Sequence, residues 1–459
     1  MYLELKFMPE SRCLQGIWSS PWIFIFAASG SAVGLGNIWK FPYVLGQNGG
    51  GAFLLVYCLC LLLVGLPVLM AEVALGRTVR SNPIDTVNDL SERRIVHKAW
   101  VFVPWLAGVT GFLILTFYSV IAGWSLAYLE RALSGDFKEI TQVGAAVMFG
   151  DLLSDPTEML LWHSVFMALV VLTVGQSVTR GLSAVVRLLL PTLVVSLILL
   201  ASYSMMIGNT SEAMDFMFRW SWQDITFDVV LAAVGLALFS LSVGMGAMFA
   251  YGAYMSKRMS IARACSIVVG VDLLVAILAG LVIFPLVFSF QIDVEAGPSL
   301  TFVSLPIIFG SLPGGLFFAG VFFLLLVVAA LTSAISMLEL FVAWLHEKFY
   351  IARLKAAFLM GLAVWFLGIA VLLSFNHWDS KIIFGMNFFE LLDEFTSLIL
   401  LPVGAILLSV LVAWFIPHSM LQNEMITKQA NHFHWWYKTL KYISIPAMLV
   451  ITFAGWIGV

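Results

Sequence analysis

One acidic residue, Asp272, stands in a long apolar stretch of this sequence, between Val271 and Leu273. A carboxylate inside a membrane span is energetically costly, so such a residue is by default a functional one. Its sequence neighbours offer no partner, and a bound cation is therefore the natural counter-charge. A salt bridge to a buried arginine or lysine is the alternative, for which the apolar stretches supply few candidates.

Two glycine-rich motifs also interrupt apolar stretches. The first is Gly30-Ser31-Ala32-Val33-Gly34-Leu35-Gly36-Asn37, and a shorter echo follows as Ser242-Val243-Gly244-Met245-Gly246. Each glycine costs a helix about 1 kcal/mol relative to alanine. Interrupted helices are tolerated in lipid where the freed backbone groups face protein or a water-filled cavity. A matched pair of interrupted spans points to the midplane binding site of a repeat-built secondary transporter.

The composition indicates a polytopic membrane protein. Of 459 residues, 61% are hydrophobic and 11% are charged, whereas soluble proteins have roughly 25% charged residues. The net charge of −3 and the lack of a basic block give no sign of a nucleic-acid partner. The histidines lack H-E-x-x-H spacing, and the glycines lack the context of a nucleotide motif. Two of the four cysteines share one apolar stretch, so we expect no structural disulfide.

Hydropathy predicts eleven spans of about 20 residues or more. They cover approximately 18–46, 50–76, 99–130, 159–178, 182–208, 224–256, 263–290, 314–346, 353–374, 386–416 and 437–458. The glycine motifs fall in the first and sixth spans, which run in opposite directions, as an inverted repeat of five plus five spans requires. We expect one transmembrane domain over 1–459, with repeats at about 18–208 and 224–416 and an extra helix at about 437–458.

Basic residues set the expected orientation. With the N-terminus inside, most of the 23 lysines and arginines lie on the cytoplasmic side. An odd number of spans then places the C-terminus outside. Two long connections, Asn209–Asp224 and Glu295–Pro313, would be external, and each is either a lid or an ordinary solvated loop.

Longer motifs resemble the signatures of the neurotransmitter:sodium symporter family. They are the Gly30–Asn37 motif, Trp39-Lys40-Phe41-Pro42-Tyr43, Gln47-Asn48-Gly49-Gly50-Gly51-Ala52-Phe53, Glu72-Val73-Ala74-Leu75-Gly76-Arg77, Phe239-Ser240-Leu241-Ser242 and Ala329-Ala330-Leu331-Thr332-Ser333. The chain is most similar to the bacterial eleven-span amino-acid transporters of that family. The resemblance implies an all-α membrane protein with the leucine-transporter fold, helices 1 and 6 unwound at mid-membrane, and sodium-driven uptake by alternating access across the bacterial inner membrane.

The resemblance also implies two sodium ions and no organic cofactor. The first sodium site would use Ala32, Asn37, Ser240 and Asp272, and the second would use Gly30, Val33, Ala329, Thr332 and Ser333. Sodium is a hard cation, which suits these oxygen ligands. Taken alone, the hydroxyls of Thr332 and Ser333 are better explained by bonds to the preceding helical turn, and it is the matching glycine break that favours a sodium site. Animal relatives balance the ion's charge with chloride, whereas Asp272 resembles the built-in carboxylate of bacterial relatives, so we expect no chloride requirement.

An amino-acid substrate needs donors for its carboxylate and acceptors for its ammonium group. Amides after the first break face a partial positive dipole, and Tyr118 matches the family's carboxylate-binding tyrosine, although packing or interface anchoring is the alternative for it. The implied substrate site comprises Ala32, Gly34, Leu35, Gly36, Ile114, Tyr118, Phe239, Ser240, Ser242, Met245, Ser333 and Met337. Its uncharged, methionine-containing pocket suits a neutral, hydrophobic or aromatic L-amino acid.

The gates depart from the family pattern. At the outer gate Lys40 replaces the usual arginine opposite Asp393, and a lysine cannot make the bidentate fork. At the inner gate the resemblance implies Trp18, Tyr254 and Glu347. The usual arginine there is replaced by Gln15, and Arg12, one turn earlier, is a candidate substitute.

Two further acidic residues, Glu72 and Glu339, lie in apolar spans. Glu72 resembles the family's glutamate that braces the unwound part of helix 6, whereas Glu339 receives no role. The main alternative to symport is a channel or substrate sensor that keeps the fold without the coupling, favoured only by Gln15; a membrane enzyme is a weaker third reading. The expected partners are the amino acid, sodium ions and the lipid bilayer, with no nucleic acid and a monomeric or weakly oligomeric chain.

Overall fold

The regular elements of this chain are helices throughout the part that the structure describes. This computed structural model describes residues 18, 20–176, 183–219, 221–291, 300–380, 385–425 and 430–457. The all-helical result is expected, because a helix satisfies its own backbone N–H and C=O groups where no water is available.

Eight helical segments among the described residues are long and apolar enough to cross a membrane. They are Gly51–Val79, which contains α3 (Gly51–Cys60) and α4 (Leu66–Val79); Lys98–Ser134, which contains α6 (Phe102–Ser134); α8 (Pro156–Val174); α9 (Ser183–Ile207); α13 (Ile261–Ser289); α15 (Gly315–Phe349); α16 (Arg353–Leu373); and Phe388–Phe415, which contains α17 (Phe388–Glu394) and α18 (Leu401–Val410). A ninth is obtained if α1 (Pro21–Ala32) and the bent continuation Gly36–Gln47, which ends in α2 (Phe41–Gln47), count as one span.

The two remaining predicted spans have a less regular form. The sixth, at 224–256, consists of α11 (Phe227–Ser240) and α12 (Ala247–Ala253) on either side of a break. The eleventh, at 437–458, is covered by α20 (Ala430–Thr439), a π-helical turn over Leu440–Ser444 and α21 (Ile445–Ile457), which follow one another without a gap. The test of length and apolarity therefore counts eight or nine spans among the described residues, against eleven from hydropathy.

Both predicted helix breaks are confirmed. Helix α1 stops at Ala32, where Val33 leaves the helical conformation, and the chain continues at an angle of 47°. The second break covers Leu241–Gly246. Within it Ser242, Gly244 and Gly246 have positive φ angles of 54°, 84° and 75°. A side chain at Gly244 would also press on the backbone of α18 (Leu401–Val410), so this position requires glycine.

The two predicted external connections contain helices. Asn209–Asp224 includes α10 (Thr210–Phe218), and the described part of Glu295–Pro313 includes a π-helical turn over Leu300–Ser304 and α14 (Leu305–Ser311). Residues 292–299 lie outside the described part of the chain. Neither connection is therefore a simple solvated loop.

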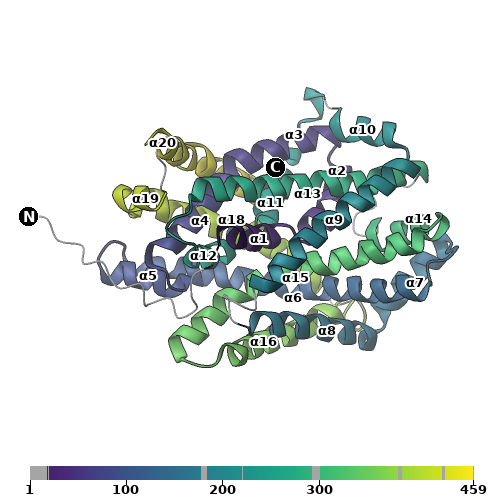
Figure 1. The fold of residues 1–459 in the computed structure, drawn as a ribbon, viewed down its shortest axis with the longest axis horizontal. Helices are drawn as coiled ribbons and strands as arrows, with labels where there is room; N and C mark the ends of the chain where they lie inside the picture. Colours follow the sequence, from purple (N-terminus) through teal and green to yellow (C-terminus); the bar gives the residue numbers. More distant parts are fainter. Residues whose placement is uncertain are drawn as a thin grey trace, which may run out of the picture.

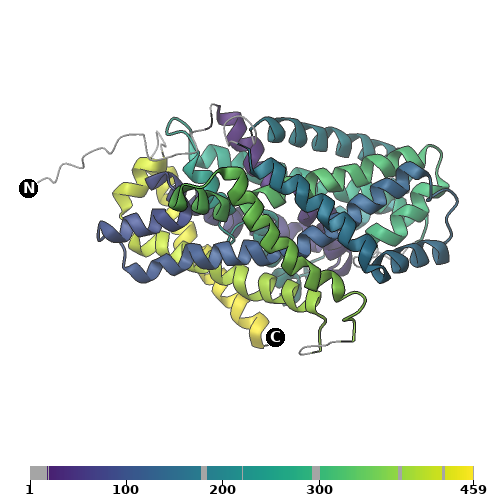
Figure 2. The ribbon, with the colours of Figure 1, turned by 90° about the horizontal axis from the view of Figure 1, so that it is seen from below.

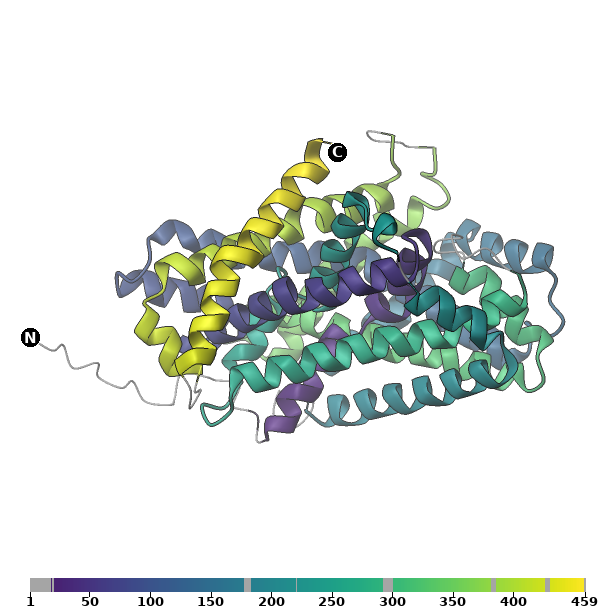
Figure 3. The ribbon, with the colours of Figure 1, turned by 90° about the horizontal axis from the view of Figure 1, so that it is seen from above.

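Long helices run between two ends that carry the short ones. In Figure 1, α5 (Pro83–Glu92), α19 (His418–Met425) and α20 lie toward one end, and α7 (Gln142–Ser154), α10 and α14 lie toward the other. Seen from below, α16 crosses beside α8 (Figure 2), and both pack on α6. Seen from above, α13 lies along α9, and α21 crosses the opposite face obliquely (Figure 3).

The two broken helices lie in the middle of this bundle. Helix α1 packs against α9, α12, α13 and α15, and every residue of α12 is buried. Helix α15 packs along α6, and α12 packs along α4 (Leu66–Val79). The breaks are thus surrounded by protein, which is the condition for irregular backbone at membrane depth.

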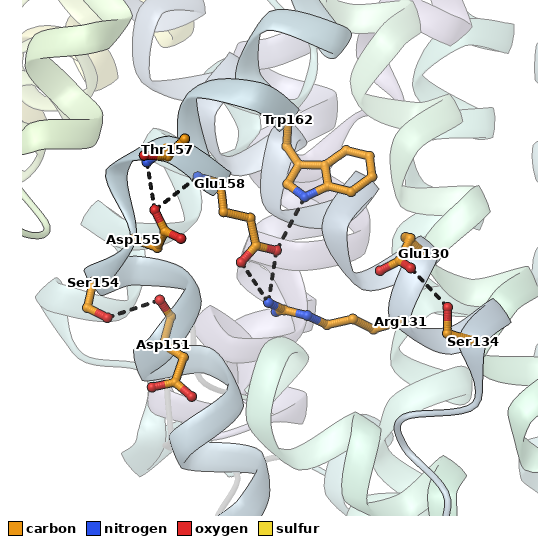
Figure 4. A network of polar contacts seen from close by, with 9 residues as sticks. All are labelled: Glu130, Arg131, Ser134, Asp151, Ser154, Asp155, Thr157, Glu158 and Trp162. Atoms are coloured by element: carbon orange, nitrogen blue, oxygen red, sulfur yellow. Dashed lines mark hydrogen bonds and ion pairs between the residues drawn. The ribbon is translucent and has the colours of Figure 1, made fainter.

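A polar network fastens the turn from α7 into α8 to the end of α6 (Figure 4). Arg131 Nη2 of α6 lies 2.9 Å from Glu158 Oε1 of α8, and Trp162 Nε1 donates to the same carboxylate. Asp155 caps α8 by accepting from the backbone N–H groups of Thr157 and Glu158. These contacts hold the start of α8 against the end of α6 at this end of the bundle.

Candidate functional site

Asp272 lies at a point where four segments meet. It is fully buried in α13, and its Oδ1 accepts a 2.8 Å hydrogen bond from Asn37 Nδ2, just after the first break. Its Oδ2 accepts from Tyr57 Oη of α3 at 3.1 Å and from Ser240 Oγ at the end of α11 at 3.4 Å. Three of the four predicted residues of the first sodium site therefore converge; the fourth, Ala32, is buried at the end of α1.

The Asp272 carboxyl group has only neutral hydrogen-bond partners among the described residues. Asn37 Oδ1 is buried and has no hydrogen-bond partner among the described residues. The ion pairs found in the described part of the chain do not include Asp272, so the alternative of a salt bridge is not observed there. A buried carboxylate beside an unused amide oxygen fits a hard monovalent cation such as sodium, because burying that charge unpaired is unfavourable.

Gly34 allows the first break to touch two helices of the bundle. A Cβ atom at this position would lie 2.8 Å from Tyr118 Oη of α6 and would collide with Ser333 Oγ of α15. The next residue, Leu35, donates its backbone N–H to Tyr118 Oη at 3.1 Å. The tyrosine hydroxyl thus lies beside the backbone of the first break, whose N–H groups could serve as donors to a substrate carboxylate.

Ser31 joins the two breaks to α15. Its carbonyl oxygen accepts hydrogen bonds from Ser242 Oγ at 2.9 Å and from Ser333 Oγ at 3.0 Å. Its own hydroxyl donates to Ser336 Oγ at 2.6 Å. Sequence reasoning missed Ser31 and Ser336, although Ser31 stands inside the first glycine motif. Tyr57 was also missed, and its only signal is a hydroxyl in an apolar stretch.

The predicted pocket side chains gather around the same two breaks. Gly111 of α6 brings that helix close to the backbone of both Met245 and Met337, since an added Cβ would lie 3.2 Å and 3.7 Å from their carbonyl oxygens. Ile114, one turn further along α6, is fully buried. Gly36 packs on Phe239, with an added Cβ 3.1 Å from its ring. All these side chains are uncharged.

The residues of the second predicted sodium site also lie close together. Gly30 of α1 packs on Thr332 of α15, with an added Cβ 3.4 Å from Thr332 Cβ. Thr332 Oγ1 donates to the Ala329 carbonyl at 2.9 Å, which is the bond that a helical threonine makes without an ion. Val33 is fully buried at the break itself. This arrangement fits Thr332 as a sodium ligand and equally fits Thr332 as a threonine that only bonds the preceding turn of its own helix.

Lys40 and Asp393 meet on one side of the two helix breaks, here called the Lys40 end. Lys40 Nζ lies 3.5 Å from Asp393 Oδ1 and 4.9 Å from the centre of the Phe239 ring. A cavity of about 380 Å³ opens beside them, lined in part by Asn48 and Asp228. Lys40 therefore contacts both the Asp393 carboxylate and the Phe239 ring at the edge of this cavity.

The opposite end, here called the Trp18 end, brings Trp18 and Tyr254 into contact. The Trp18 backbone N–H donates to the Tyr254 carbonyl at 3.1 Å, and their rings pack edge to face. The Tyr254 hydroxyl, however, donates to Glu339 Oε1 at 2.7 Å. Glu347 instead accepts bonds from the backbone and side chain of Asn82 at the start of α5.

Other residues noted in the sequence have the following positions. Glu72 Oε1 accepts a 2.6 Å hydrogen bond from the Gly244 backbone N–H, so this acid does contact the second break. Gln15 and Arg12 lie outside the described residues. In the described part of the chain no group of three or more histidine, cysteine or acidic side chains is placed to hold a metal ion.

Comparisons with known proteins agree with this geometry. The model of the sodium:neurotransmitter symporter family matches residues 15–141 and 149–457. The chain is 37% identical to the sodium-dependent transporter YhdH of Bacillus subtilis (strain 168), over 98% of this chain and 99% of that protein. It is 30% identical to a sodium-dependent transporter of Haemophilus influenzae, over 95% and 97% of the two chains.

A solved structure gives the same fold. The crystal structure of MhsT in complex with L-phenylalanine matches with a TM-score of 0.89 and 38% identity, over 96% of this chain and 99% of MhsT. The inverted repeat with two unwound helices is the leucine-transporter fold. Members of the matched family are transporters and not enzymes. The family model and the relative from Bacillus subtilis both match most of this chain, and the chain belongs to the sodium:neurotransmitter symporter family.

Proposed function

We propose that this protein imports neutral, hydrophobic or aromatic L-amino acids together with sodium ions, by alternating access and without chloride. The observation that carries the proposal is Asp272, a fully buried carboxylate bonded by Asn37 at the first helix break. The names of two relatives, both sodium-dependent transporters, support sodium as the coupling ion. The complex of MhsT with L-phenylalanine supports the substrate class.

Two sodium ions would be held at the breaks, with no organic cofactor. At the first site Asp272, Asn37 Oδ1 and the Ser240 hydroxyl would provide oxygen ligands, with the Ala32 carbonyl. At the second site the ligands would be the carbonyls of Gly30, Val33 and Ala329 with the hydroxyls of Thr332 and Ser333. Each ion would supply positive charge that joins α1 to the rest of the bundle. Asp272 would balance the first ion, which removes the need for a bound chloride.

The substrate would lie between the breaks. Its carboxylate would meet the backbone amides at Gly34, Leu35 and Gly36 and the Tyr118 hydroxyl, which the Leu35 amide already contacts. Its ammonium group would meet carbonyls near Phe239 and Ser240. Ile114, Met245 and Met337, with Ser242 and Ser333, would surround the side chain. A charged side chain would be buried there without a partner, at a cost of several kcal/mol.

The remaining predictions concern the setting of the molecule. We place it in the bacterial inner membrane with the N-terminus in the cytoplasm, so that the Trp18 end faces inward and the Lys40 end outward. Repeat one would extend over about 18–208 and repeat two over about 224–416, with the extra helix at about 437–458. We expect a monomer or a weak oligomer.

Competition binding tests the substrate assignment. Binding of labelled L-phenylalanine to the purified protein in sodium should be displaced by bulky neutral amino acids and not by Asp, Glu, Lys or Arg. Tyr118→Phe should weaken every substrate alike, because Tyr118 would hold the shared carboxylate. Tyr203→Phe is the matched control, since its hydroxyl bonds the Pro313 carbonyl on an exposed face. Displacement by charged amino acids, or a loss limited to one side-chain class, would contradict the assignment.

Replacement of Asp272 by asparagine tests the ion assignment. Asp272→Asn should raise the sodium concentration needed for half-maximal binding, and chloride should partly restore it, because the ion has lost its fixed counter-charge. Normal sodium dependence of the variant in chloride-free buffer would show that Asp272 is not the counter-charge. Amino-acid binding without sodium-driven uptake in the wild type would favour the sensor alternative.

A further inference from the structure

We infer that the last span of the bundle supports the central site, and that its Ser444 is a positioning residue for the first sodium site. This span consists of α20, the π-helical turn Leu440–Ser444 and α21, and it lies outside the two predicted repeats. The inference rests on the proposed function, because the sodium site at Asp272 is itself a proposal. It gives a role to a segment that the motifs and the central site leave without one.

A proline removes the helical partner of one backbone carbonyl in the second span, Gly51–Val79. In an α-helix the Leu63 carbonyl would accept from the N–H of residue 67, but Pro67 has no N–H. The helix widens here into a π-helical turn over Leu61–Gly65. Ser444 is fully buried, and its hydroxyl donates to the Leu63 carbonyl at 2.6 Å. The last span thus supplies the donor that the second span lacks.

The same arrangement recurs in the tenth predicted span, within Phe388–Phe415. The carbonyl of Ala413 lies four residues before Pro417, in another π-helical turn. Tyr437 of α20 donates its hydroxyl to this carbonyl at 2.5 Å. A buried carbonyl without a donor is costly in a membrane, where water cannot replace the missing bond. Two hydroxyls of the last span therefore replace two N–H groups that prolines remove.

The second span holds the central site on both sides of its π-helical turn. Before the turn, Tyr57 Oη donates to Asp272 Oδ2 at 3.1 Å and lies 3.0 Å from Ser240 Oγ. After the turn, Glu72 accepts the backbone N–H of Gly244. The turn therefore sets the register between the tyrosine at the sodium site and the acid at the second break.

The turn also touches the second break directly. A Cβ atom at Gly65 would lie 2.5 Å from Leu241 Cδ1, at the start of the break. Return of the turn to an α-helix would remove about one residue from it and rotate α3 by about 100° relative to α4. Tyr57 would then move away from Asp272. Ser444 opposes this change by holding the Leu63 carbonyl, and so it positions Tyr57 without touching the ion.

Sodium-dependent binding tests the role of Ser444 on the whole protein. Ser444→Ala should raise the sodium concentration for half-maximal binding of labelled L-phenylalanine by about fivefold, with wild-type affinity at saturating sodium. Ser444→Thr keeps the hydroxyl and should restore most of the wild-type value. The matched control is Thr452→Val, which removes a buried hydroxyl of the same span that has no hydrogen-bond partner among the described residues. It should behave like the wild type.

A double variant separates positioning from a general loss of stability. Because Ser444 would act through Tyr57, Ser444→Ala should raise the sodium requirement no further in a Tyr57→Phe background. Multiplication of the two effects in the double variant would overturn the inference. So would a wild-type sodium requirement in Ser444→Ala, or an equal shift in Thr452→Val.

Hydrogen–deuterium exchange keeps this test separate from that of the proposed function. In Ser444→Ala, amides of α3 and of Leu241–Gly246 should exchange about fivefold faster than in the wild type, and those of α8 should be unchanged. Wild-type exchange in both segments would contradict the supporting role of the last span. Exchange needs neither sodium nor an amino acid, so a wild type without sodium-dependent binding would refute the proposed function while exchange still decides this role.

Discussion

The charged groups at the two ends of the pathway differ in burial and geometry. At the Lys40 end, Lys40 and Asp393 are 3.5 Å apart, with side chains 19% and 31% exposed. At the Trp18 end, Glu339 is fully buried and Arg353 is 9% exposed, and both have further protein partners. A partly exposed pair such as Lys40–Asp393 contributes less than a fully buried one and is screened by salt. Breaking a buried pair leaves an uncompensated charge and costs much more.

This difference suggests how the two ends share the work of alternating access. Under the proposed mechanism, the partly exposed Lys40–Asp393 pair would be the easier of the two to separate. The buried contacts of Glu339 and Arg353 would cost more free energy to separate, so the Trp18 end would be the harder of the two to open. The following predictions test this contrast, beginning with the largest expected effect.

Removal of the buried cation should have the largest effect. Arg353→Ala leaves Glu339 charged and unpaired, and we expect a loss of about 3–5 kcal/mol in stability. Thermal unfolding of the purified protein in detergent, followed by tryptophan fluorescence, measures it. A loss below about 1 kcal/mol would mean that the Glu339–Arg353 pair stabilises the protein no more than the Lys40–Asp393 pair does.

Replacing both buried charges should restore most of that stability. In Glu339→Leu with Arg353→Leu no charge is left uncompensated, and such replacements are often close to neutral. The melting temperature should recover toward the wild type, whereas hydrogen–deuterium exchange in α12 should stay faster than in the wild type because Tyr254 has lost its acceptor. Recovery of both the melting temperature and the wild-type exchange rate in α12 would show that the Glu339–Arg353 pair only stabilises the fold.

Breaking the Lys40–Asp393 pair should change stability only slightly, and salt should remove the change. Lys40→Ala should change stability by about 0–1 kcal/mol at low ionic strength. About 1 M choline chloride, which adds no sodium, should abolish the difference, because the Debye length falls to about 3 Å. A difference that persists in high salt would mean that Lys40 acts mainly through the Phe239 ring.

The smallest effect should come from strengthening the Lys40–Asp393 pair. Lys40→Arg can form two parallel hydrogen bonds with Asp393, and we expect a gain of a few tenths of a kcal/mol. Exchange in α2 and α11 should slow slightly in the absence of sodium. Faster exchange there would indicate that the guanidinium does not fit this site.

Much of the fold could be predicted from the sequence because the signals are local. Long apolar runs gave most of the spans, and the glycine motifs located both breaks, since Gly244 and Gly246 have backbone conformations that other residues rarely adopt. The number of spans found among the described residues is lower than the eleven predicted, because the predicted sixth span is interrupted by the second break and the eleventh includes a π-helical turn between α20 and α21. The short helices α10 and α14 were missed because nine and seven residues give little periodic signal.

The candidate site was predictable where a motif carries it. Asn37, Ser240 and Asp272 come from three different spans, and only the family resemblance connected them before the structure placed them together. Tyr57, Ser31 and Arg353 act through contacts between distant segments, which spacing along the chain cannot reveal. The Tyr254–Glu339 bond was missed for the same reason, because 85 residues separate its partners.

Uptake by proteoliposomes tests the central claim most directly. The wild-type protein would be reconstituted in chloride-free vesicles, and the initial rate of labelled L-phenylalanine uptake would be measured under an inward sodium gradient and under an equal potassium gradient. We predict accumulation above the external concentration with sodium and none with potassium. Equal uptake in both gradients, or no uptake in either, would contradict sodium-coupled amino-acid symport.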